Sequence, residues 1–205
     1  MANTTFSGPV RSLNGFETVS KNATTGAITI TSGSKMAVEA AANAGIEGTA
    51  AVYVTQVERF KSDTDTNVNV VKTTLLIDLT GLRSTAAGDI IGKNGEGVAY
   101  IGQVTTANQG TVFGVTMQCL ETPAGGDPDI NLHSATEGTG VEDTPISNLT
   151  ETLIINSGDL TAGSLVAGGD IAADQFLYLT AGATTDADYT AGRLLITIIG
   201  YDVAS

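Results

Sequence analysis

The chain of 205 residues carries 22 acidic and nine basic side chains, which gives a formal net charge of −13. A surface of this sign repels a phosphate backbone and an anionic bilayer, so we expect neither direct nucleic-acid binding nor membrane binding. Charged residues make up only 15% of the chain, well below the roughly 25% of ordinary globular domains. Thr, Ser, Asn, Ala and Gly replace them, and Thr-rich sequence favours extended backbone.

The first 26 residues are small and polar, with isolated apolar side chains and no regular period. Gly8-Pro9 and Gly15 interrupt any helix. We therefore expect residues 1–26 to form an extended arm that docks on a partner, and residues 27–205 to form a single domain. The arm residues expected to make that contact are Phe6, Val10, Arg11, Leu13 and Phe16. The segment lacks the basic and apolar stretches of a signal peptide, which predicts synthesis in a cytoplasm.

From residue 27 onward, short runs of alternating apolar and polar residues are separated by turns rich in Gly, Asn, Asp and Ser. A change of alternation near Val70-Val71 predicts a bulge, and the strongly apolar run at the end of the chain predicts a central strand. Only residues 34–45 have helical composition, so we expect at most one short helix. Strands are predicted at residues 27–31, 50–60, 68–79, 97–105, 111–121, 149–156, 174–180 and 193–202.

These patterns predict an all-β fold, an antiparallel jelly-roll-like sandwich or barrel that limits exposed strand edges. One long loop is expected from Glu121 to Asn148. Loops of this length in compact domains are usually functional or disordered. The loop residues that we expect to contact a partner are Pro123, Asp127, Pro128 and Asp129.

The residue types needed for catalysis are scarce in this chain. His133 is the only histidine and is expected to be solvated in the long loop, whereas Cys119 lies in apolar, strand-like sequence that predicts a buried, inert thiol. The absence of Trp argues against the flat aromatic platforms of carbohydrate sites. The oxygen-rich stretch at residues 63–67 lacks the Gly and the Glu of a calcium loop. We therefore predict that the protein is not an enzyme and binds no cofactor or metal.

Four segments resemble small virion structural proteins of tailed bacteriophages, particularly marine and cyanobacterial ones. They cover about a fifth of the chain: Asn3–Ser12 with Asn14-Gly15-Phe16, Cys119–Ile130, Tyr178–Ala183 and Asp186–Gly192. The resemblance implies a virion component.

Among virion roles, a capsid decoration (cement) protein is the best match, because such proteins are small, β-rich and commonly trimeric. The resemblance implies that the major capsid protein is the partner, that the chain forms a homotrimer, and that it lies on the capsid exterior. Each copy would bridge adjacent capsomers and stabilise them. The alternatives are a capsid fibre or knob, a tail structural protein, or a carbohydrate-binding β module for host recognition.

Overall fold

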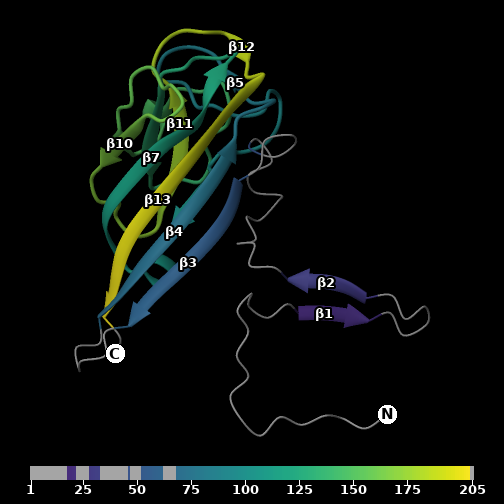
Figure 1. Ribbon diagram of the computed structural model, residues 1–205. Coiled ribbons are helices and arrows are strands. Elements are labelled where there is room, and N and C mark those ends of the chain that lie inside the picture. The colour runs from purple at the N-terminus through teal and green to yellow at the C-terminus, as the bar shows by residue number, and fades with distance from the viewer. Residues whose placement is uncertain (1–17, 22–27, 33–45, 47–51, 62–67, 204–205) are drawn as a thin grey trace, which may run out of the picture. The chain divides into compact units, whose positions relative to one another are not determined.

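The computed structural model describes residues 18–21, 28–32, 46, 52–61 and 68–203, with side chains for Ile46 and residues 70–201 (Figure 1). The chain forms two compact units, residues 1–35 and 36–205. In the first unit, β1 (Thr18–Lys21) pairs antiparallel with β2 (Ile28–Ser32). β1 lies within the segment predicted as an arm, and β2 begins the segment predicted as the domain. The arm residues themselves lie outside the described residues.

The second unit contains two main antiparallel sheets, which confirms the all-β prediction. The finer jelly-roll comparison stays a prediction. The larger sheet has the order β10-β7-β13-β4-β3, and the smaller has the order β6-β11-β8-β9. The strands of the large sheet are β3 (Val52–Lys61), β4 (Val68–Asp78), β7 (Thr111–Ala124), β10 (Leu165–Gly168) and β13 (Ala191–Val203). Those of the small sheet are β6 (Gly102–Val104), β8 (Ile130–Ala135), β9 (Glu151–Ile155) and β11 (Gln175–Ala181).

Two short strands, a short helix and a 3-10 turn lie outside the two main sheets of this unit. β5 (Arg83–Ser84) pairs with β12 (Ala187–Asp188). A four-residue helix, α1 (Thr106–Gln109), begins at a side-chain cap from Thr105, and a 3-10 turn, η2 (Ile146–Asn148), precedes β9. The helix predicted at residues 34–45 lies outside the described residues.

The main core fills the space between the two sheets. Alternate residues of each strand point into it, as Leu194, Ile196 and Ile198 do from β13, and all three are buried. β13 lies between β4 and β7, so the predicted central position of this strand is confirmed (Figure 1). The other strands contribute Leu75, Ile77, Val115, Met117, Cys119, Ile130, Leu132, Leu177 and Leu179.

A second, smaller core covers the opposite side of the small sheet. Tyr178 of β11 lies there, with Ile90, Ala99, Ala135 and Ile146. Its hydroxyl donates to the carbonyl of Glu137 at 2.7 Å, and burial raises the pKa of Tyr178 to about 12. The small sheet is therefore covered on both faces by this chain.

Three local predictions were wrong. The segment predicted as one long loop contains β8 and the end of β7, because the short Ile130-Asn131-Leu132 alternation lies between Pro- and Gly-rich stretches that mask it. The short edge strand β10 was not predicted. No bulge occurs where β4 pairs with β13, since the register runs unbroken from Arg193↔Asp78 to Val203↔Val68. The register shift lies instead in β3, between Val54 and Gln56.

Replacing Ile196 with Ala tests the central position of β13. Ile196 is fully buried between the sheets, so Ile196→Ala should lower the free energy of unfolding by about 3 kcal/mol. Ile196→Val, which removes one methylene, should cost about 1 kcal/mol. Denaturant unfolding of both variants measures the two losses. Equal and small losses would contradict the placement of this side chain in the core.

Candidate functional site

The predicted contact residues of the 121–148 segment lie in and around the turn between β7 and β8. Pro123 is buried at the end of β7, and Pro128 and Asp129 are partly exposed. Asp127 is only 1% exposed. These four residues are close together in the structure, but Asp127 reaches no partner from this position because its carboxylate is enclosed by its own chain.

Hydrogen bonds on every side fix Asp127. Its carboxylate accepts from the amides of Asp129 at 3.1 Å and Ala183 at 2.6 Å, and its carbonyl accepts from the Tyr189 hydroxyl at 2.7 Å. Gly126 packs so closely on the Tyr189 ring that a Cβ at this position would lie 2.6 Å from it. The turn is therefore held rigidly, and Asp127 acts as its internal brace.

Asp129 lies beside two other carboxylates. Burial raises the pKa of Asp129, and the neighbouring charges of Asp127 and Asp159 add to the effect. Its Oδ1 is buried and has no hydrogen-bond partner among the described residues. No group of three or more His, Cys, Asp or Glu in the described part of the chain is placed to hold a metal ion. The negative charges of Asp127 and Asp159 repel the charged form of the Asp129 carboxylate.

The two side chains considered for nucleophilic chemistry have structural contacts. Cys119 is buried, as predicted, and its thiol donates to the carbonyl of Glu121 at 3.2 Å. Burial raises the pKa of this thiol, which disfavours the reactive thiolate. The expectation that His133 is solvated in a loop was wrong. It lies on β8, 8% exposed, with Nδ1 at 2.8 Å from the Glu151 carboxylate on β9.

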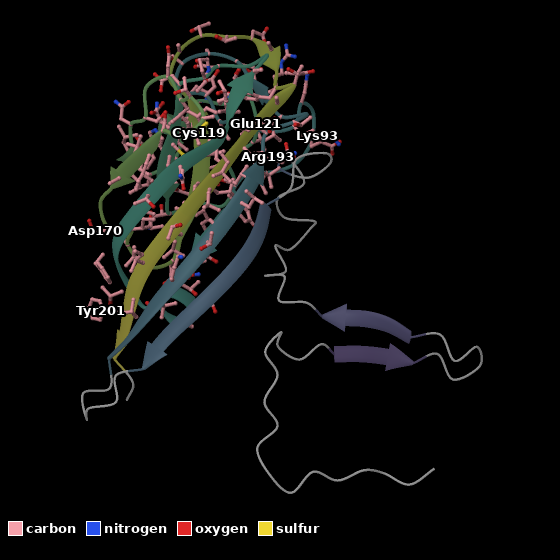
Figure 2. All side chains as sticks on the ribbon, in the orientation of Figure 1. Lys93, Cys119, Glu121, Asp170, Arg193 and Tyr201 are labelled. Carbon is pink, nitrogen blue, oxygen red and sulfur yellow. The ribbon has the colours of Figure 1, made fainter. Side chains whose placement is uncertain are left out.

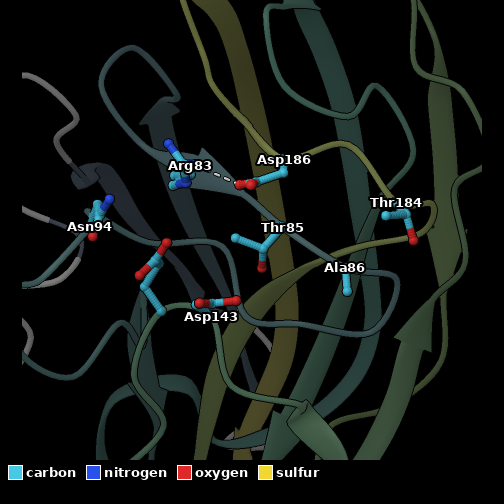
Figure 3. A pocket seen from close by; sticks show the side chains of 8 residues that line it. Arg83, Thr85, Ala86, Asn94, Asp143, Thr184 and Asp186 are labelled. Atoms are coloured by element: carbon cyan, nitrogen blue, oxygen red, sulfur yellow. Dashed lines mark hydrogen bonds and ion pairs between the residues drawn. The ribbon is translucent and has the colours of Figure 1, made fainter.

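A shallow hollow of about 340 Å³ lies beside β5 (Figure 3). Arg83 stands at its edge, and its guanidinium donates to Asp186 at 2.6 Å and to Asp188 at 3.0 Å. Burial raises the pKa of Glu142, another residue that lines the hollow, and the Asp143 charge adds to this. The hollow is thus acidic, with its one guanidinium already paired with carboxylates. The lining residues are Arg83, Thr85, Ala86, Asn94, Glu142, Asp143, Thr184 and Asp186.

Exposed apolar side chains gather on the outer side of the large sheet. It carries four of the five large apolar side chains that are well exposed: Phe113 (54%), Leu120 (46%), Leu165 (63%) and Tyr201 (38%). The fifth, Leu153, lies on β9 of the small sheet. The Phe113 and Tyr201 rings contact each other, with centroids 6.2 Å apart.

Strand register assigns the side chains of this surface to rows, because directly paired residues point to the same face. One row is Leu165, Gln118, Leu195 and Leu76, and the next is Ala167, Thr116, Thr197 and Thr74. A third is Gly114, Ile199 and Lys72, and a fourth is Thr111, Tyr201 and Val70. We call these rows, with Phe113, Leu120, Asp78, Glu121 and Arg193, the outer face.

Charge on the outer face lies in two places, beside the start of β13 and at Lys72 in the third row. Arg193 lies between Asp78 at 3.5 Å and Glu121 at 3.6 Å, beyond the leucine row. Figure 2 shows Arg193 and Glu121 toward one end of the large sheet and Tyr201 toward the other. Lys72 in the third row is paired with Glu58 of β3, so strand register assigns two cations and three anions to the face. Their sum is −1, in a chain whose net charge is −13.

None of these outer-face residues was predicted as a contact residue from the sequence. A signal was present, because the runs at 111–121 and 193–202 are apolar at both odd and even positions. Such runs are typical of strands buried on both faces. In this unit, the chain covers both faces of the small sheet. It covers only one face of the large sheet, whose outer face keeps exposed apolar side chains.

No family model, curated protein sequence or solved structure matches this chain. Among the described residues, no helix has the length and apolar character needed to cross a membrane.

Neutralising Asp129 should stabilise the chain at neutral pH. Because the folded pKa of Asp129 is raised above its ordinary 3.8, the folded chain binds the proton more tightly than the unfolded chain does. The stability gained from this proton is present below pH 3.8 and is lost as pH rises through the folded pKa. Asp129→Asn should therefore raise the melting temperature at pH 7 by a few degrees and give little gain near pH 3.

Thermal unfolding between pH 3 and pH 7 measures this effect. Asp170→Asn is the matched control, since Asp170 is an exposed acid with the same side chain. A gain from Asp129→Asn that stays constant with pH, or that the control reproduces, would refute the assignment to carboxylate repulsion.

Proposed function

We propose that this chain is a structural protein of a virus particle, a capsid decoration protein that binds the outer capsid surface and bridges adjacent capsomers. The observation that supports the proposal best is the outer face of the large sheet. Exposed large apolar side chains that gather on one face of a domain mark sites of protein–protein contact. The arm expected at residues 1–26 supplies a second contact, and a bridging protein needs at least two.

The side-chain chemistry of the described residues agrees with an assembly role. Cys119 and His133, the side chains considered for catalysis, are buried and bonded within the chain. Asp127 and Tyr189 brace a turn. The resemblance of four segments to phage virion proteins supports the virus particle as the setting.

The acidic charge favours the capsid exterior over the interior. With a net charge of −13, the chain would be repelled by packaged DNA at close range. On the outer surface this charge also keeps free copies soluble and apart until they meet a binding surface. We therefore expect binding after the capsid shell has formed, from the outside.

Binding to purified capsids that lack the protein tests the proposal. The protein should bind expanded capsids, saturate at hundreds of copies per particle, and raise the temperature at which the capsids break. Electron microscopy of the saturated particles gives position and copy number. Saturation at a dozen copies or fewer would assign the chain to a vertex or tail instead. No binding to capsids, or binding to an isolated polysaccharide on a glycan array, would refute the decoration role.

Removing the start of the chain tests the arm separately. Deletion of residues 1–17, which leaves β1 and β2 whole, should keep the melting temperature of the protein and lower its capsid affinity at least tenfold. A double substitution, Phe6→Ser with Phe16→Ser, should reproduce most of that loss. Full affinity in both variants would show that the arm makes no contact with the capsid.

A further inference from the structure

We propose that the outer face binds the outer face of a second copy of this chain, about a two-fold axis that runs along the strands between β7 and β13. The proposal rests on the assignment of this face as an assembly surface and adds its partner and its symmetry.

Charge is the first argument for a second copy. Two copies that each carry −13 repel each other wherever their acidic surfaces meet. The charged residues that strand register assigns to the outer face sum to −1, and its inner rows hold only Lys72 and Glu58, which are paired across β4 and β3. A matching partner surface must be apolar and near neutral, and the outer face itself has this composition. Self-association through it therefore avoids the repulsion that other contacts would cause.

The arrangement of residues on the two central strands is the second argument. The proposed axis exchanges β7 with β13, and β10 with β4. Because Glu121 and Arg193 are paired across these strands, the axis places Glu121 opposite Arg193 of the partner subunit. Each dimer then contains two such contacts between opposite charges. The same operation keeps like charges on this pair of strands apart.

The apolar residues match under the same operation. Leu165 and Leu76 stand at the two ends of one row, so the axis places Leu165 opposite Leu76 of the partner subunit. Phe113 and Tyr201 are neighbours on β7 and β13, so the two aromatic pairs meet as a cluster of four rings. Leu165, the most exposed large apolar side chain of the face, thereby covers the half-buried Leu76.

The proposed contact is of modest size. The axis brings together four strands, β10, β7, β13 and β4, which at about 4.8 Å spacing span about 19 Å, and the length from Arg193 to Tyr201 at about 3.4 Å per residue is roughly 27 Å. The product is about 520 Å² per copy, so the two copies together bury about 1,040 Å², which reaches the ~1,000 Å² lower limit of a specific interface. Sheets that pack face to face with aligned strands are a common arrangement in proteins.

Sedimentation of the purified full-length chain tests the proposal directly. The wild-type protein should sediment as a dimer at micromolar concentration. Leu165→Asp should raise the dimer dissociation constant at least a hundredfold, because it places a carboxylate in the apolar interface. Leu153→Asp is the matched control, since Leu153 is similarly exposed but lies on the small sheet. A monomer at all concentrations, or equal effects of the two substitutions, would overturn the proposal.

A charge exchange tests the symmetry. Arg193→Glu and Glu121→Arg should each weaken the dimer about tenfold or more, and the double variant should recover most of the wild-type affinity. Thermal unfolding of dilute monomers measures how much the contact between Arg193 and Glu121 within one chain stabilises the fold. A substitution that changes only the stability of the monomer is thereby distinguished from one that weakens the dimer. A trimer in solution, or a double variant no better than the single ones, would refute the two-fold arrangement.

These experiments distinguish failure of the dimer proposal from failure of the proposed decoration function. If Leu165→Asp abolishes the dimer and the protein still binds capsids, the face joins copies and the arm binds the shell. A protein that dimerises through this face but never binds capsids would refute the decoration role alone. A monomeric protein whose capsid binding is lost with Leu165→Asp would show that the face contacts the capsid, which refutes self-association.

Discussion

The structure of the second unit depends on the pairing of β13 with β4 on one side and β7 on the other. This strand sends Leu194, Ile196 and Ile198 into the core and carries Leu195, Thr197, Ile199 and Tyr201 on the outer face. A slip of one residue would exchange the two sets. Because both sets contain large apolar side chains, hydrophobic pattern alone specifies this register weakly.

Two contacts near opposite ends of β13 fix the register more firmly. At Gly200, a Cβ would lie 2.0 Å from the carbonyl oxygen of Gln109, so no other residue type fits against the end of α1 without a shift. Near the start of the strand, Arg193 lies between Asp78 and Glu121. A slipped strand would bring Ile199 or Tyr201 against that carbonyl and would separate Arg193 from both acids.

The sequence predicted the fold class well because alternation and turn residues report directly on half-buried strands. The positions of β4, β7, β9, β11 and β13 were predicted to within a few residues, and Cys119 was correctly expected to be buried. β8 was missed because its pairing with β11 and β9 supplies the stability that its short sequence does not indicate. The same pairing buries His133, which no local pattern could reveal. The outer face was missed because a strand that is apolar on both faces does not show by its sequence which face the rest of the chain will bury.

The pairing of β4 with β13 also determines when this chain can fold. Val68 is paired in register with Val203, so the large sheet joins segments that are synthesised far apart in time. Contacts between residues so distant in sequence slow folding, because the entropy of closing the intervening chain is lost before the contacts form. Until β13 leaves the ribosome, the apolar side chains of β4 and β7 lack the strand between them. The nascent chain therefore exposes these apolar side chains during the synthesis of its second half, and a chaperone that binds extended apolar segments would act on it then.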